Sequence, residues 1–247
     1  MLNSFNKLPP EERLIVALDC AADEALEIAV SLQGRARWMK VGMTLFYESG
    51  PEIIQSLKSA GFKVFLDLKF HDIPHQVEGA AASATAHKVD MLTMHTLGGI
   101  EMLQAAQKGA QSTAVALGID APVTLGITVL TSMDKTTLEE IGIKFPVVDQ
   151  VYLLASLAGE AGISGVVASP HEAEMLRTLL GPDAFIVTPG VRPRGSEKGD
   201  QKRIASPFEA LSGGASHIVI GRPITQAQNR LQAFDNIIEE IKQGFAL

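Results

Sequence analysis

Short apolar runs alternate along the chain with longer stretches whose apolar residues recur at helical spacing. Eight of these runs are rich in valine, isoleucine and leucine, and we expect them to form strands at residues 14–19, 38–42, 63–69, 91–96, 124–131, 165–169, 185–190 and 217–222. Most are apolar throughout, as expected for strands that are covered on both faces. Such strands are typical of a parallel sheet whose connections are helices.

The stretches between the runs have the periodicity of helices. Helices are predicted at residues 23–33, 51–60, 75–87, 99–110, 148–161, 170–179, 207–211 and 225–242. Eight strand–helix units match an α/β protein of the (β/α)8 or TIM-barrel fold, and we expect residues 1–247 to form a single domain. A doubly wound open sheet is the alternative, but it would be expected to carry a glycine fingerprint after its first strand. The chain reads Asp19-Cys20-Ala21-Ala22 at that point.

Polar residues gather where the predicted strands end. They are Asp19, Lys69, His95, Thr96, Thr131 and Ser169, and the turns Thr188-Pro189-Gly190 and Gly221-Arg222 follow the last two strands. In a (β/α)8 barrel the C-terminal ends of the strands form the catalytic face. These positions therefore support the fold and also predict where the active site lies.

Charge and cysteine content narrow the class of function. The chain has 21 Lys and Arg against 28 Asp and Glu, and no basic run is long enough to follow a nucleic-acid backbone, so no nucleic-acid partner is expected. The only cysteine, Cys20, cannot form an intrachain disulfide, which fits a reducing compartment. The first apolar run stops at Asp19, and no run approaches about 18 uncharged apolar residues. We therefore expect a cytoplasmic protein with no membrane contact.

The densest polar cluster occupies residues 67–74. Asp67 and Lys69 are two apart on a predicted strand, so their side chains point the same way. At a catalytic edge the carboxylate would fix the ammonium, and the ammonium could donate a proton. A structural ion pair is the alternative. Asp72 makes that alternative harder, because two carboxylates beside one lysine leave a net negative charge that a structural pair does not need.

Other ionisable residues in and near the strands have simpler interpretations. Lys40 lies in an apolar strand and needs an acidic partner or a position at the mouth of the barrel. Asp19 is the expected partner, and a lysine that extends its charge to solvent is the alternative. His71 and His75 have the spacing of metal ligands on one helix face. Pro74 lies between them and is expected to break that helix turn, so no metal site is predicted.

The end of the chain carries the features of a phosphate site. Gly221 and Arg222 precede a proline that suits the first turn of a helix, so backbone N–H groups and a guanidinium can face an anion. A capped helix with a solvated arginine is the alternative. The basic loop at residues 191–205, which contains Arg192 and Gln201, would cover the anion. Thr131 could bind a planar polar ligand or cap the next turn.

These residues resemble the bacterial type of the orotidine 5′-phosphate decarboxylase family. The similarity runs through the segments VALD, DLKFHDIP, TVLTSM, TPGVRP, GDQKRI and VIGRPIT, over residues 14–225. It implies a phosphate-binding (β/α)8 barrel that is active as a homodimer with shared active sites. The family converts orotidine 5′-monophosphate to UMP and CO₂ without metal or organic cofactor.

The resemblance also implies roles for the residues at the reacting end of the site. Lys69 would donate a proton to C6 of the pyrimidine, and Asp67 would lie beside the substrate carboxylate. Asp19 and Lys40 would bind the ribose hydroxyls and join the charge network, which makes Lys40 catalytic as well as substrate-binding. Asp72 would be contributed to the neighbouring subunit's site, where it would reach the ribose and count among the catalytic residues.

The remaining substrate contacts that the resemblance implies lie further from C6. Thr131 would contact the pyrimidine, and Ile73 would be a further substrate-binding residue. Four residues would hold the phosphate: Arg192, Gln201, Gly221 and Arg222.

Two other functions remain open on the sequence. A metal-dependent phosphosugar lyase or epimerase would share the phosphate grip and the acidic strand ends, but it would need a divalent ion. A non-catalytic nucleotide-binding barrel would bind UMP and leave orotidine 5′-monophosphate unchanged.

Overall fold

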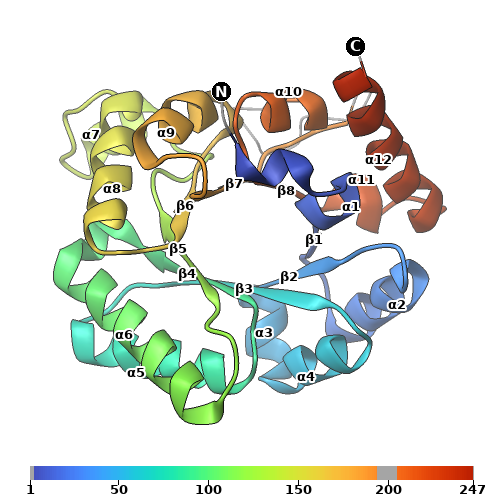
Figure 1. Ribbon diagram of the computed structural model, residues 1–247, viewed down its shortest axis with the longest axis horizontal. Coiled ribbons are helices and arrows are strands. Elements are labelled where there is room, and N and C mark those ends of the chain that lie inside the picture. The colour runs from blue at the N-terminus through green and yellow to red at the C-terminus, as the bar shows by residue number, and fades with distance from the viewer. Residues whose placement is uncertain (1–2, 194–204, 247) are drawn as a thin grey trace.

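The computed structural model describes residues 3–193 and 205–246. In these residues, parallel strands close into a barrel in the order β1 to β8 (Figure 1). The strands are β1 (Leu14–Leu18), β2 (Trp38–Gly42), β3 (Lys63–Phe70), β4 (Met91–His95), β5 (Val123–Ile127), β6 (Gly165–Val167), β7 (Phe185–Thr188) and β8 (His217–Ile220). The closed order confirms the predicted (β/α)8 barrel and excludes the open sheet.

Helices surround the barrel on its outside (Figure 1). The α-helices are α1 (Pro10–Arg13), α2 (Ala22–Leu32), α3 (Met43–Ser49), α4 (Glu52–Ser59), α5 (Pro74–Ala86), α6 (Gly99–Leu117), α7 (Lys135–Glu140), α8 (Val147–Glu160), α9 (Ala173–Leu180), α10 (Pro207–Ser212), α11 (Arg222–Thr225) and α12 (Arg230–Ala246). Short 3₁₀ helices are η1 (Ser4–Lys7), η2 (Thr96–Gly98) and η3 (Pro170–Glu172). Within the described ranges, no helix is both long enough and apolar enough to cross a bilayer.

Several predicted boundaries are wrong. The fifth strand ends at Ile127 rather than at residue 131, because its neighbour β6 ends at Val167 and offers no further ladder partner. Thr131 therefore lies beyond the strand. The last long helix begins at Arg230 rather than at residue 225, and the residues after β8 form the separate short helix α11. The sequence pattern also missed the short helices α3 and α7.

The alternation of side chains along the strands divides the core in two. In β1, Ile15 and Ala17 point into the barrel, whereas Leu14, Val16 and Leu18 pack against the helices outside. The buried interior cluster is completed by Trp38, Phe65, Met91, Leu125, Val187 and Val219. Because both faces of each strand are covered, the strands are apolar at nearly every position.

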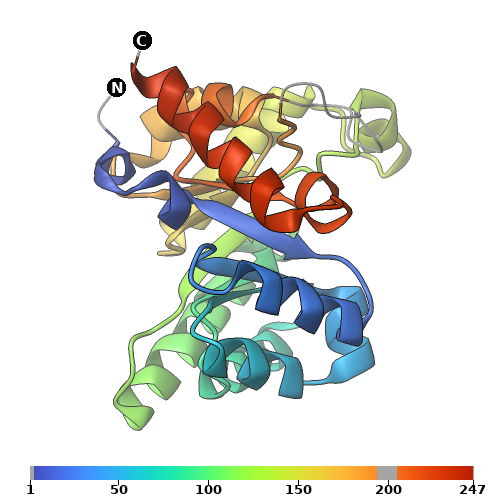
Figure 2. The same cartoon turned by 90° about the vertical axis from the view of Figure 1, so that its right-hand side faces the viewer.

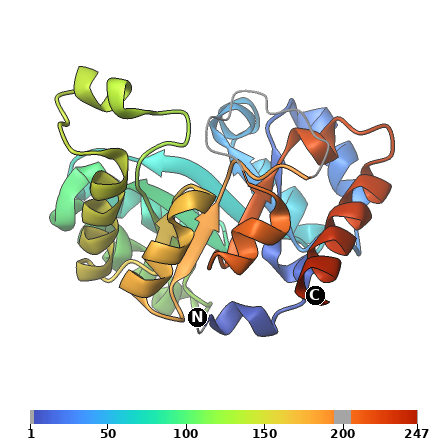
Figure 3. The same cartoon turned by 90° about the horizontal axis from the view of Figure 1, so that it is seen from above.

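The N-terminal segment closes the end of the barrel where the strands begin. Phe5 of η1 packs edge-on against Phe185 and His217, with ring centroids 4.7 and 5.7 Å away. Trp38 lies 5.7 Å from the same histidine ring. Figure 3 shows the N-terminal helix at one end of the barrel and the segment that bears α7, coloured yellow-green, at the other. An aromatic cluster thus seals one end and leaves the opposite end for the site.

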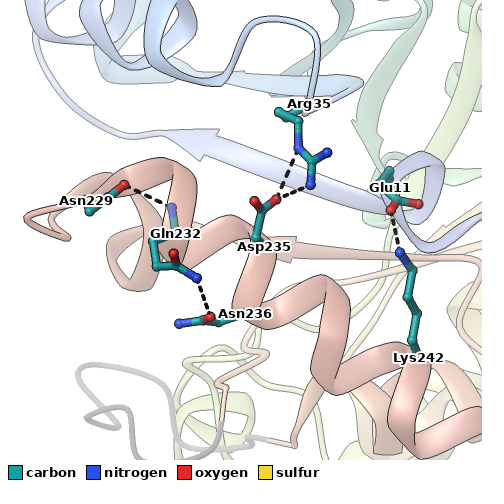
Figure 4. A network of polar contacts seen from close by, with 7 residues as sticks. All are labelled: Glu11, Arg35, Asn229, Gln232, Asp235, Asn236 and Lys242. Carbon is teal, nitrogen blue, oxygen red and sulfur yellow. Dashed lines mark hydrogen bonds and ion pairs between the residues drawn. The ribbon is translucent and has the colours of Figure 1, made fainter.

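The C-terminal helix α12 is attached to the N-terminal part of the chain at the surface. It runs beside α1 and α2, as Figure 2 shows. Lys242 pairs with Glu11 at 3.0 Å, and the Arg35 guanidinium pairs with Asp235 (Figure 4). Exposed ion pairs of this kind contribute at most about 1 kcal/mol each. Most of the adhesion of α12 comes instead from its buried side chains, which are Phe234, Ile237, Ile238 and Ile241.

Candidate active site

A cavity of about 760 Å³ opens at the C-terminal ends of the strands. Its apolar floor includes Phe65, Val167 and Val219 from the barrel interior. Eight of the residues predicted for the site line its walls: Asp19, Lys40, Asp67, Lys69, Thr131, Arg192, Gly221 and Arg222. The position of this cavity agrees with the rule that (β/α)8 barrels place their sites on this face.

Four charged side chains form a row along one wall of the cavity. Lys40 Nζ lies 2.8 Å from Asp19 Oδ1 and 3.9 Å from Asp67 Oδ2. Lys69 Nζ lies 2.9 Å from the same Asp67 oxygen. The charges alternate in sign, so each ammonium has a carboxylate beside it. The Asp67 side chain is only 14% exposed, which strengthens its interaction with both lysines.

Gly42 leaves the space in which the first of these pairs forms. A Cβ at this position would lie 3.0 Å from Lys40 Nζ and 3.1 Å from Asp19 Oδ1. Those distances are tighter than ordinary contacts, so a side chain would push the pair apart. The absence of a side chain at the end of β2 therefore allows Lys40 and Asp19 to pair.

The regular alternation predicted for Asp67 and Lys69 is wrong in detail. The β3–β4 register shifts between Leu66 and Phe70, and Lys69 has a φ of 54°, in the left-handed region. This conformation is costly for a residue with a Cβ. The two side chains do meet, but an irregular backbone brings them together.

Thr93 of β4 is a contact of this wall that the sequence interpretation missed. Its hydroxyl lies 3.0 Å from Asp67 Oδ1 and 2.9 Å from the Lys69 backbone nitrogen. A polar residue at an inward position of an apolar strand was the available signal. This signal could not predict the contacts with Asp67 and Lys69, because they depend on the shifted register between β3 and β4.

The described residues predicted to bind phosphate line the same cavity beyond the Asp19 end of the row, because β8 pairs with β1. Gly221 and Arg222 lie where β8 passes into α11, and Arg192 follows β7. A parallel bridge between Val191 and Ala205, with a 2.9 Å bond from Arg192 N to Ala205 O, holds the two ends of the basic loop together. Gln201 lies outside the described residues.

Two predicted residues lie outside the cavity of the described chain. Asp72 is exposed, and its carboxylate accepts a 2.6 Å hydrogen bond from the Ile73 backbone N–H. Ile73 is 63% exposed. In the described part of the chain, Asp72 forms no ion pair with Lys69, so the expected second carboxylate beside that lysine is absent within one chain.

Two further titratable groups near the site are held neutral. Burial, reinforced by Glu24 and Asp19, raises the pKa of the Cys20 thiol to about 11. Burial also lowers the pKa of His95 to about 4, with the nearby His71 ring and Lys69 adding to the effect. The His95 ring stacks on His71 at 5.1 Å and does not line the cavity. Near pH 7 neither group adds charge to the row.

Comparison with known proteins places this arrangement in a family. Residues 12–237 match the model of the orotidine 5′-phosphate decarboxylase / HUMPS family. The chain belongs to this family. The resemblance seen in the sequence is therefore confirmed over nearly the whole chain.

Similar proteins of the family cover the chain almost completely. A Moorella thermoacetica protein named orotidine 5′-phosphate decarboxylase is 46% identical over 243 residues, which is 98% of this chain and 96% of that protein. A Parasynechococcus marenigrum protein of the same name is 46% identical over 91% of this chain and 92% of its own length.

A crystal structure of orotidine 5′-phosphate decarboxylase from Lactobacillus acidophilus superposes with a TM-score of 0.82 at 36% identity, covering 93% of this chain and 99% of that one. This similarity extends the family assignment from the sequence to the folded barrel.

Proposed function

We propose that this chain decarboxylates orotidine 5′-monophosphate to UMP and CO₂ in pyrimidine biosynthesis, as a carboxy-lyase without metal or organic cofactor. The observation that carries the proposal is the Asp19–Lys40–Asp67–Lys69 row, which lines one cavity together with two arginines, Arg192 and Arg222. The row suits a reacting centre that develops negative charge, and the arginines suit a phosphate. Relatives that are 46% identical carry the name of this activity.

The chemical step requires stabilisation of a carbanion. The bond between C6 and the carboxylate carbon breaks, CO₂ departs, and the electron pair stays on C6. The ring offers that pair little delocalisation, so fixed charges must stabilise it. Lys69 supplies a positive charge near C6 and then transfers a proton from Nζ to C6. Solvent returns the proton to the lysine.

Asp67 has two tasks in this scheme. It fixes the Lys69 ammonium through the 2.9 Å ion pair, and it lies beside the substrate carboxylate. Two unit charges about 4 Å apart interact by about 4 kcal/mol at an effective dielectric constant of about 20. This repulsion falls as neutral CO₂ leaves, which favours the transition state over the bound substrate.

The remaining residues orient the nucleotide. Asp19 and Lys40 bind the ribose hydroxyls, and Thr131 contacts the pyrimidine. The phosphate is held by Arg192, Gln201, Gly221 and Arg222. Binding energy from this remote group positions C6 against Lys69, so it contributes to the rate as well as to affinity.

The active protein is proposed to be a homodimer in which Asp72 and Ile73 reach the neighbouring subunit's site. Asp72 is exposed, and exposed apolar side chains of Ile73 and Leu97 lie at the ends of adjacent strands. The stacked rings of His71 and His95 join these two segments. An exposed carboxylate next to an exposed apolar side chain suits contact with a second copy.

Subunit mixing tests the shared site. Lys69→Ala and Asp72→Ala subunits should each be inactive alone, and exchange between them should restore activity, because one of the two sites in the mixed dimer is intact. Absence of recovery after verified exchange would contradict the proposal of a shared site.

A spectrophotometric assay tests the function itself. Wild-type protein with EDTA present should convert orotidine 5′-monophosphate to UMP at an undiminished rate. Loss of activity with EDTA would favour the metal-dependent phosphosugar enzymes. Binding of UMP without any change in orotidine 5′-monophosphate absorbance would indicate a non-catalytic nucleotide-binding protein.

A further inference from the structure

Thr93 lies in the barrel interior beneath the charge row and is fully buried. Its hydroxyl touches both residues of the reacting pair, through the Asp67 carboxylate and the Lys69 backbone. The direction of both bonds follows from chemistry. A backbone N–H can only donate, so the hydroxyl accepts from Lys69. An ionised carboxylate can only accept, so the single hydroxyl proton goes to Asp67.

The first of these bonds supports an irregular backbone. Leu66 pairs with Leu92 and Phe70 pairs with Met94, so four steps along β3 correspond to two along β4. The residues between lose their regular ladder partners, and Lys69 takes up its left-handed conformation there. A buried N–H left without an acceptor is costly. The Thr93 hydroxyl provides that acceptor at 2.9 Å.

The second bond fixes the orientation of the Asp67 carboxylate. Oδ1 accepts from Thr93 at 3.0 Å, and this leaves Oδ2 facing Lys69 at 2.9 Å and Lys40 at 3.9 Å. A rotation of the carboxylate would change both distances to the lysines. One hydroxyl therefore holds the backbone of the proton donor and the carboxylate of its partner at the same time.

We propose that Thr93 is a positioning residue for the decarboxylation. Its hydroxyl sets the distance between Lys69 Nζ and Asp67 Oδ2 without touching the substrate. The inference rests on the proposed function, because the two residues it positions are those assigned to the chemical step.

Substitutions that differ only in the hydroxyl test this role. Thr93→Val keeps the shape and removes the hydroxyl, and misplacement of reacting groups by about 1 Å costs about 100-fold in rate. We expect kcat to fall by about that factor, with KM within about threefold, because the phosphate contacts are intact. Thr93→Ser should retain kcat within about threefold, since it keeps both hydrogen bonds.

Two further variants separate this effect from a general loss of stability. Thr93→Ala and Thr93→Ser differ by the hydroxyl alone. Comparing their kcat values tests the role of the hydroxyl if Thr93→Val does not fold. Thr124→Val removes another fully buried threonine hydroxyl, which contacts Gln107 and Ser164 away from the cavity. That variant should lose stability and keep kcat.

Amide hydrogen exchange provides a readout that does not depend on activity. Exchange at the Lys69 N–H should accelerate at least tenfold in Thr93→Val and remain slow in Thr93→Ser. If the wild type is active, two results would overturn the role of Thr93. One is a kcat of Thr93→Val equal to that of the wild type, and the other is the same kcat in Thr93→Ala and Thr93→Ser. A wild type that does not decarboxylate the substrate would overturn the proposed function and, with it, the positioning role of Thr93 in the reaction. If the wild type is inactive but exchange at the Lys69 N–H still accelerates in Thr93→Val, the hydroxyl would remain the support of the irregular β3 backbone.

Discussion

The two ends of the barrel hold their cations in opposite ways. Where the strands begin, Arg13 and Arg177 are 3% and 2% exposed, and their guanidinium groups donate mainly to backbone carbonyls. Within the described residues, neither forms an ion pair. Where the strands end, Lys40 and Lys69 pair with carboxylates and face a cavity.

The pKa values of buried groups at the closed end illustrate this difference. Burial lowers the pKa of Arg13 to about 10, with the nearby Arg177 adding to the effect. Burial also lowers the pKa of His217 to about 3. Desolvation dominates at this end, and the guanidinium groups of Arg13 and Arg177 donate to protein oxygens. At the open end, a bound ligand would complete the surroundings of the charges, so we infer that one end stabilises the barrel and the other performs chemistry.

The largest expected effect is at the open end. Lys69→Ala should reduce kcat by at least about 1000-fold, because it removes both the proton donor and the charge that stabilises the carbanion. The protein should still fold, since Asp67 keeps Lys40 and Thr93 as partners. Decarboxylation assays and thermal unfolding measure the two results. Near-normal turnover in this variant would refute the mechanism.

The matching change at the closed end should affect stability alone. Arg177→Met leaves the carbonyls of Gly214, Gly181, Pro182 and Ala184 without this donor. We expect the free energy of unfolding to fall by about 3 kcal/mol or more, with kcat of the folded protein unchanged.

Urea unfolding measures this loss, and Lys242→Gln is its control. Lys242 pairs with Glu11 at the surface, so its replacement should change the free energy of unfolding by less than about 1 kcal/mol (Figure 4). A loss of kcat in Arg177→Met at full folding would contradict the division between the two ends.

Loss of an arginine proposed to hold the phosphate should have a smaller effect, mainly on substrate binding. Arg222→Ala should raise KM by about 10- to 100-fold and lower kcat less, because a charge-assisted contact to phosphate is lost far from C6. Initial-rate measurements over a range of substrate concentrations separate the two constants. Arg35→Ala, which removes a surface arginine paired with Asp235, should leave both constants unchanged. An unchanged KM in Arg222→Ala would place the phosphate elsewhere.

The smallest effect concerns pH and the closed end. The folded-state pKa of His217 lies near 3, below its ordinary value of 6.5, so the unfolded chain binds a proton that the folded chain refuses. The stability from the neutral ring is fully present above pH 6.5 and decreases as pH falls toward 3.

His217→Phe keeps an aromatic ring at this position and removes the group whose protonation makes stability depend on pH. Between pH 6 and pH 4, the slope of unfolding free energy against pH should become shallower by up to about 1.4 kcal/mol per pH unit. Urea titrations at several pH values measure the difference from wild type. Equal slopes would show that this ring is protonated in the folded state.

Much of the barrel was predictable because its strands are continuous apolar runs. The strand Trp38–Gly42 was predicted at both ends, and all eight strands were located. The end of β5 was misplaced because it depends on where β6 stops, and β6 lies some 40 residues further along the chain. Short helices such as α3 have too few turns to show a periodicity. The single-domain interpretation of residues 1–247 stays a prediction.

The site was predictable where it depends on strand ends alone. The pairing of Lys40 with Asp19 follows from the adjacency of the first two strands. The left-handed Lys69 and its contact with Thr93 could not be predicted, because a register shift between two strands leaves no local pattern in either. The catalytic and binding roles of the site residues, and the homodimer, stay predictions.

The origin of the proton at C6 tests the central claim most directly. The Lys69 ammonium exchanges with solvent, so in D₂O it carries deuterium. UMP formed from orotidine 5′-monophosphate by the wild-type protein in D₂O should therefore contain one deuterium at C6, detected by proton NMR and mass spectrometry. UMP kept in D₂O without the protein gives the background. Product that carries hydrogen at C6, or consumption of substrate without formation of UMP, would contradict the account.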